Sequence, residues 1–168
     1  MLCLLALAGC TKIPDTYAPP IQRKTPEEAS LGLKHFVAMS APDASDYVVA
    51  DVLPAVEAGG WRWTMQKPAL RFRVPTTQNL RLMAEFTVPE ITFQQTGPVS
   101  ISFYVNDHLL ETKRYDNFGG ETFEKAVPAD WISTEAPVIV RMEIDKMWVA
   151  PTDGVRRGFI LNRIGFVQ

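Results

Sequence analysis

Residues 80–105, LRLMAEFTVPEITFQQTGPVSISFYV, contain the clearest strand pattern of this chain. Apolar residues occupy alternate positions in both of its halves: Leu80, Leu82, Ala84, Phe86 and Val88, then Val99, Ile101, Phe103 and Val105. Successive side chains of a strand point to opposite faces, so each run buries one face and exposes the other. This one-sided alternation is typical of antiparallel sheets, because strands of a parallel sheet are apolar on both faces.

Three other stretches show the same alternation, at 48–52, 70–74 and 138–144. Proline and glycine separate them, and Asn106-Asp107 falls between two apolar runs as a two-residue hairpin turn, since both residues tolerate a positive φ. Short strands at this spacing without intervening helices predict an all-β fold. We expect antiparallel sheets closed as a two-sheet β-sandwich or a barrel.

Composition is that of a single globular domain. The 168 residues are 46% hydrophobic and 21% charged, and 17 Lys+Arg against 19 Asp+Glu give a net charge of −2. No basic block is present to displace phosphate counterions, so we expect no nucleic-acid partner. With two His and two Cys, and neither His-x-x-x-His nor Cys-x-x-Cys, the sequence predicts no metal site and no cofactor.

Residues 1–10, MLCLLALAGC, are apolar throughout but too few to span a bilayer. Their end, Leu7-Ala8-Gly9-Cys10, resembles the bacterial lipobox. The resemblance implies a signal segment at 1–10 that is cleaved before Cys10, which carries the acyl chains. Thr11 follows where Asp would resemble an inner-membrane retention signal, so the resemblance implies a lipid anchor in the outer membrane.

Two expectations qualify that assignment. No Lys or Arg precedes Lys12, so the basic start of a signal peptide is missing and we expect the true start to lie upstream. The alternative is an N-terminal strand or tail of a cytosolic protein.

A proline-rich tether and lead-in is expected at 11–42, with Pro14, Pro19 and Pro20 favouring an extended spacer. Thr25-Pro26-Glu27-Glu28 has the pattern of a helix start. The residues after Glu28 are compatible both with a helix of one to three turns and with a loop leading into a short strand at 35–39. The β-sandwich domain is then expected at 43–168.

Four stretches together resemble the jelly-roll modules of galactose-binding-like type, which occur as bacterial lipoproteins and as accessory domains beside glycosyltransferases. They are 61–64 (WRWT), 97–101 (GPVSI) with 104–106 (YVN), 127–131 (VPADW), and 144–146 (IDK) with 153–154 (DG), 157–159 (RGF) and 164–166 (IGF). The resemblance covers about 43–168 and implies a jelly-roll topology. It carries no catalytic residue, so it conveys the fold better than the function.

Catalytic patterns are absent from the sequence. There is no Gly-x-Ser-x-Gly, and the two histidines, His35 and His108, have no evident acid and nucleophile beside them. Asp130, Asp145 and Asp153 are candidates for a calcium site, but the favoured interpretation is that they are solvated acids of turns. We therefore predict that the protein is not an enzyme.

Aromatic residues in loops are the remaining candidates for ligand binding, because a pyranose ring stacks on an indole or phenol face. The predicted carbohydrate-binding residues are Tyr115, Asn117, Trp148, Asp153, Arg156 and Arg157. Trp61 and Trp63 share one strand phase, and we expect one or both to fill the core. An alternative role for Arg157 is pairing with Asp153 to fix the last turn.

These expectations combine into two functions. The first is a membrane-anchored, non-catalytic binding module of the cell envelope that recognises a glycan; it requires at least two exposed, coplanar aromatic rings beside Arg or Asp. The alternative is a structural or assembly lipoprotein that contacts another envelope protein through a sheet face or edge.

Overall fold

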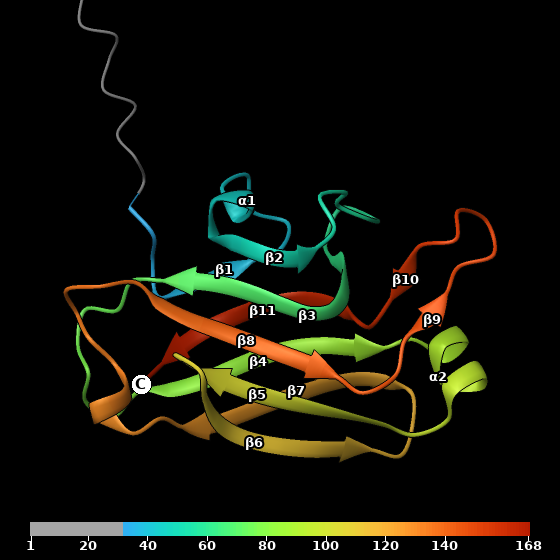
Figure 1. The fold of residues 1–168 in the computed structure, drawn as a ribbon. Coiled ribbons are helices and arrows are strands. Elements are labelled where there is room, and N and C mark those ends of the chain that lie inside the picture. Colours follow the sequence, from blue (N-terminus) through green and yellow to red (C-terminus); the bar gives the residue numbers. More distant parts are fainter. Residues whose placement is uncertain (1–31) are drawn as a thin grey trace, which may run out of the picture. The chain divides into compact units, whose positions relative to one another are not determined.

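The computed structural model describes residues 32–168, which form an almost entirely antiparallel β structure (Figure 1). The predicted all-β fold is confirmed. The main ladder runs in the order β6-β5-β8-β3-β11-β4-β7, with β1 added beside β11 and β2 beside β3. One half contains β2 (Val48–Val52), β3 (Arg62–Phe72), β8 (Val138–Ile144), β5 (Val99–Val105) and β6 (His108–Tyr115). The other half contains β1 (Phe36–Ala38), β11 (Ile160–Val167), β4 (Arg81–Val88) and β7 (Gly119–Ala126).

Strand β3 belongs to both halves. Its first residues, Arg62 and Trp63, pair with β11, whereas residues 69–72 pair with β8. The ladder therefore curls at β3, and its two halves face one another as a sandwich.

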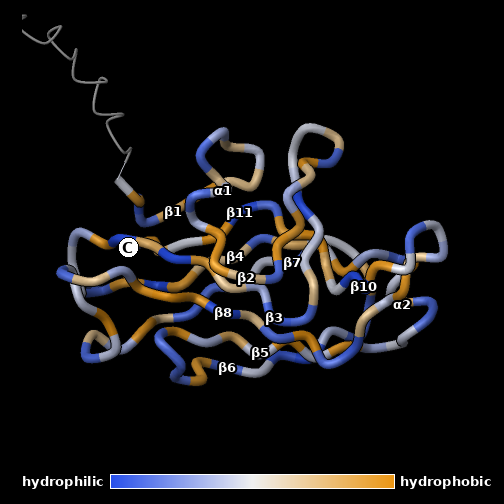
Figure 2. Tube along the Cα trace, turned by 45° about the horizontal axis from the view of Figure 1, so that its top comes forward, coloured by the Kyte–Doolittle hydropathy of each residue, from blue (hydrophilic) through white to orange (hydrophobic). Residues whose placement is uncertain are grey.

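The core lies between these halves and contains the apolar residues of the alternating runs. Phe103 of β5 and Phe123 of β7 stack with ring centroids 3.6 Å apart and planes 4° from parallel. Figure 2 allows the alternation of hydrophobic and hydrophilic residues to be followed along the strands. For β4, β5 and β8 the buried face is the face that the alternation predicts. For β2 the prediction of one buried face was wrong, because none of its five residues is buried.

Helices are few and short: α1 (Ala44–Tyr47), α2 (Glu90–Thr96) and a 3-10 turn (Ala129–Trp131). The expectation of no helix between strands was wrong for α2, which connects β4 to β5. Pro89 fixes φ at −67° at its start, and Gly97 ends it with a φ of 66°, which favours glycine. Within residues 32–168, no helix combines the length and apolar character needed to cross a bilayer.

The hairpin turn at Asn106-Asp107 is confirmed, with φ values of 46° and 68° and Val105 paired to His108. Near the start of the described chain, residues 36–38 form the short strand β1. A short strand at 35–39 was one of the two alternatives that the sequence left open. Met39 after it is fully buried, so the packed domain includes residues that the sequence assigned to the lead-in. The lipobox, the proline-rich spacer and the expected helix start at Thr25 lie outside the described residues.

Candidate functional site

Trp61 and Trp63 lie on the outer side of the β3 corner. The inward positions are taken by Arg62 and Thr64, which are both buried. Thr64 Oγ1 donates to the Phe159 carbonyl at 2.9 Å and accepts from the Phe159 N–H at 3.1 Å. Because these polar groups are satisfied inside, the two indoles are displaced outward and stay half-buried. The expectation that they fill the core was therefore wrong.

A two-stranded arm of β9 (Trp148–Val149) and β10 (Arg156–Arg157) packs beside this corner. Trp148 pairs with Arg157 in its ladder. Gly158 ties the arm to β3, since its N–H donates to the Thr64 carbonyl at 2.8 Å. A Cβ at Gly158 would lie 2.6 Å from the Met65 carbonyl oxygen, so this close approach requires glycine.

The corner and the arm bring together four side chains, Trp61, Trp63, Trp148 and Arg157, which we term the tryptophan cluster. The ring centroids of Trp63 and Trp148 are 6.1 Å apart with planes at 40°, and those of Trp61 and Trp63 are 5.8 Å apart at 84°. The Arg157 guanidinium lies 5.7 Å from the Trp63 ring and 5.9 Å from the Trp148 ring. The cation thus lies beside two indole faces, an attractive arrangement.

Asp153 fixes the orientation of Arg157. Its carboxylate accepts from both terminal nitrogens of the guanidinium, at 3.0 and 2.7 Å, and from the Val155 N–H at 2.9 Å. These hydrogen bonds lower the pKa of Asp153 below its ordinary value, and the bond to Asp153 raises the pKa of Arg157. The bidentate pair holds the guanidinium plane in place beside the indoles.

Two donors of the tryptophan cluster are buried without a partner among residues 32–168. They are Nε1–H of Trp148 and Nε–H of Arg157. Burying an unpaired donor costs free energy, so each of these groups would gain from a hydrogen-bond acceptor.

The structure separates the predicted site residues into two groups. Trp148, Asp153 and Arg157 come together, and Arg156 lies next to them on β10 with its side chain exposed. Asn117 is exposed in the turn between β6 and β7. No hydrogen bond or ion pair of the described chain joins it to the cluster.

Tyr115 does not belong to a ligand surface. Its side chain is 3% exposed and packs edge-on against Phe86 at 5.3 Å. Burial, with Glu121 and Glu111 adding to it, raises the pKa of Tyr115. A ring enclosed in this way has no free face for a sugar, so the predicted stacking role of Tyr115 was wrong.

A shallow groove of about 260 Å³ crosses β4, β7 and β11, with Glu85 and Glu121 in its lining. Glu85 is ion-paired with Arg163, and the hydrogen bond to Arg163 lowers the pKa of Glu85. A carboxyl group that acts as a general acid needs a raised pKa, so Glu85 is poorly suited to that role. Within residues 32–168, no group of three or more His, Cys, Asp or Glu side chains could hold a metal ion.

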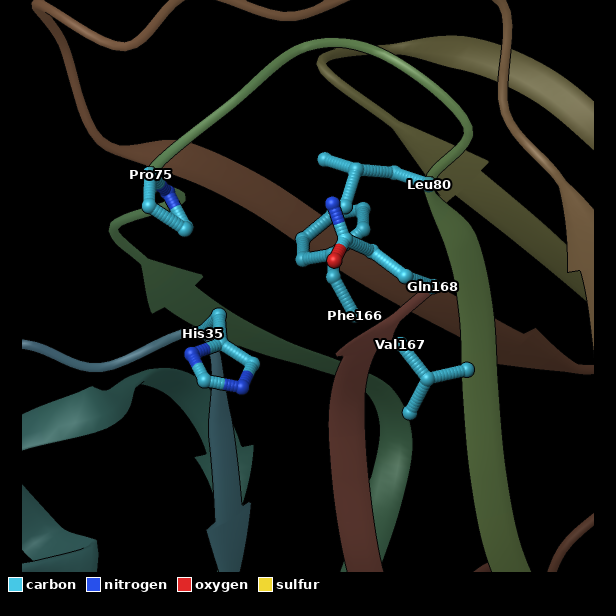
Figure 3. Close-up of a pocket in the computed structure, with 6 residues that line it drawn as sticks. All are labelled: His35, Pro75, Leu80, Phe166, Val167 and Gln168. Carbon is cyan, nitrogen blue, oxygen red and sulfur yellow. The ribbon is translucent and has the colours of Figure 1, made fainter.

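A second pocket, of about 140 Å³, is lined in part by the last residues of the chain, Phe166, Val167 and Gln168. Figure 3 shows His35 and Pro75 across it from Leu80, Phe166 and Gln168. Its walls are mainly apolar, and none of the described residues that line it is a Lys, Arg, Asp or Glu that could orient a ligand.

Comparison with known proteins adds no assignment. No protein-family model matches the chain, and the curated proteins include no matching sequence. The geometry of the tryptophan cluster and the sequence patterns are therefore the features from which a function can be inferred.

The pair between Asp153 and Arg157 gives a testable pH dependence. Because the pKa of Asp153 is lowered, the pair is present above the ordinary aspartate range and is lost as pH falls through the lowered value. A carbon-detected NMR titration of the Asp153 carboxyl group should give a midpoint below that of an unpaired aspartate. Arg157→Gln should raise this midpoint, whereas Arg156→Gln should leave it unchanged; equal midpoints in both variants would contradict the pairing.

Proposed function

We propose that this protein is a lipid-anchored, non-catalytic binding module of the cell envelope that recognises carbohydrate at the tryptophan cluster. The observation that carries the proposal is the gathering of three indoles outside the core, with an oriented arginine beside two of them. Aromatic side chains outside a core are informative when they form a patch.

Carbohydrate suits this chemistry because a pyranose has an apolar C–H face and a rim of hydroxyl groups. The indoles supply apolar faces, and the Arg157–Asp153 pair supplies charged groups for hydroxyls. The requirement of exposed, coplanar rings is not met, since the three indoles are half-buried and the planes of Trp63 and Trp148 are 40° apart. An angled pair fits one sugar unit or a chain end better than the flat side of an extended polysaccharide.

The anchor in this proposal is the thiol of Cys10, supported by the sequence Leu7-Ala8-Gly9-Cys10. Acyl chains at this position attach a domain to the bilayer surface, and each buried CH₂ contributes about 0.8 kcal/mol. Mass spectrometry of the protein from bacterial membranes should find Cys10 acylated and N-terminal. A Cys10→Ser variant that still fractionates with the outer membrane would contradict the anchor.

Glycan binding is tested with an array probed by the full chain and by Trp63→Ala and Trp148→Ala. Removing a stacking indole should weaken binding about tenfold or more, which corresponds to about 1.4 kcal/mol or more. Phe118→Ala is the matched control, because it removes an exposed aromatic ring that lies outside the cluster. Absence of any bound glycan, or equal binding by all variants, would overturn the proposal.

One observation favours the alternative, an assembly lipoprotein that contacts another envelope protein. Three large apolar side chains are exposed around α2: Ile91 at 40%, Phe118 at 51% and Val149 at 52%. Phe118 also packs on Phe93 of α2, with centroids 6.1 Å apart. For this function, photocrosslinking in intact cells should give protein adducts from position 118 and not from position 63.

A further inference from the structure

Arg62 is a buried cation without a counter-ion. Its side chain is 5% exposed, and it takes part in no ion pair among residues 32–168. Burying a charge is costly unless it is paired, and removal of one partner from a buried pair is strongly unfavourable. Arg62 therefore lies in an environment that an anion would complete.

Two of the three guanidinium nitrogens have protein partners. Nε donates to the Met39 carbonyl at 3.1 Å, and Nη1 donates to Ser45 Oγ at 3.0 Å. Nη2 makes no hydrogen bond to any residue of the described chain. The guanidinium is thus held in place by two bonds while one of its nitrogens stays available.

A pocket of about 170 Å³ lies beside this arginine. The pocket is lined by two polar residues, Arg62 and Ser45, and by three apolar residues, Val48, Val52 and Pro54. Such a pocket suits a molecule with one anionic end and one apolar end.

We infer that this pocket binds a small monocarboxylate with a short apolar tail. A guanidinium binds a carboxylate through charge-assisted hydrogen bonds in a fixed geometry. Phosphate fits less well, because its oxygens on all sides would lie against Val48 and Val52. Arg62 points to the opposite face of β3 from Trp63, so the inference is independent of carbohydrate binding.

The test is an NMR titration of the full 168-residue chain with isovalerate, isovaleramide and inorganic phosphate. Isovalerate should shift the amide signals of Ser45, Val48 and Val52 saturably. Isovaleramide has the same tail but no charge, and phosphate has the charge but no tail, so each should bind at least tenfold more weakly. No saturable shift with isovalerate, or equal binding of either comparison ligand, would overturn the inference.

Variants separate recognition by Arg62 from a general anion effect. Arg62→Met should weaken isovalerate binding at least tenfold. Arg71→Met is the matched control, since Arg71 also lies on β3 and its Nε donates to a carbonyl, that of Asp46, at 2.9 Å. Binding should be unchanged in this control.

Pro54→Trp keeps the test decisive if Arg62→Met fails to fold. Pro54 is exposed and lines the pocket, so an indole there should block it without breaking the bonds of Arg62. If Pro54→Trp, or a folded Arg62→Met, binds isovalerate with wild-type affinity, the inference is wrong. The role of the guanidinium would then be limited to its hydrogen bonds with Met39 and Ser45.

Discussion

Gly165→Ala should lower the free energy of unfolding by about 3 kcal/mol or more. Strand β1 pairs with β11, with Phe36 opposite Gly165, so closely that a Cβ at Gly165 would lie 2.3 Å from the His35 carbonyl oxygen and 2.5 Å from the Phe36 Cα. Both atoms belong to the backbone, so no side-chain rotation relieves the clash. The φ of 155° adds strain for an L-residue, and overpacking alone costs about 1–3 kcal/mol.

Urea unfolding followed by circular dichroism would measure this loss. The matched control is Gly120→Ala, because Gly120 lies in β7 and no atom comes within 4 Å of a Cβ there. This control should change stability by less than about 1 kcal/mol. If the two variants have the same midpoint and slope, the close contact between β1 and β11 does not exist in solution.

Phe86→Ala should be equally damaging, with an expected loss of about 3–5 kcal/mol. Phe86 is buried on β4, and its ring lies 5.3 Å from Tyr115, 5.4 Å from Phe159 and 6.1 Å from Phe103, measured between centroids. Phe103 on β5 and Tyr115 on β6 belong to the opposite half of the sandwich, and Phe159 immediately precedes β11. Truncation therefore leaves a cavity where the halves meet, and rigid strands cannot close it.

Phe118→Ala removes the same atoms from an exposed position and serves as the control in the same urea experiment. Its expected effect is less than about 1 kcal/mol. A loss for Phe86→Ala no larger than that of Phe118→Ala would mean that the Phe86 ring is not at the centre of the core.

The sequence predicted best the strands with one fully buried face. For β5 and β8 the predicted and observed ranges coincide, and β4 begins one residue later than expected. Strand β7 was missed, and β6 was implied only by the hairpin turn before it, because both strands lie at the ends of the ladder, where burial no longer alternates. The seven residues of α2 are too few for a helical period, although Pro89 and Gly97 marked its ends.

Part of the candidate site was visible in the sequence because it is local. Trp148, Asp153 and Arg157 lie within ten positions, so one turn brings them together. The outward orientation of Trp63 could not be predicted, since it depends on Thr64 bonding to Phe159, 95 positions away. Tyr115 was misassigned for a similar reason, because its burial depends on contact with Phe86.

Arg62 and Trp63 are consecutive residues of β3 whose side chains point to opposite sides. One peptide bond joins them, so a change of the backbone at either residue alters the position of the other. The buried guanidinium and the indole outside the core are therefore coupled through the strand backbone. A substitution chosen to alter one side should therefore be checked spectroscopically on the other.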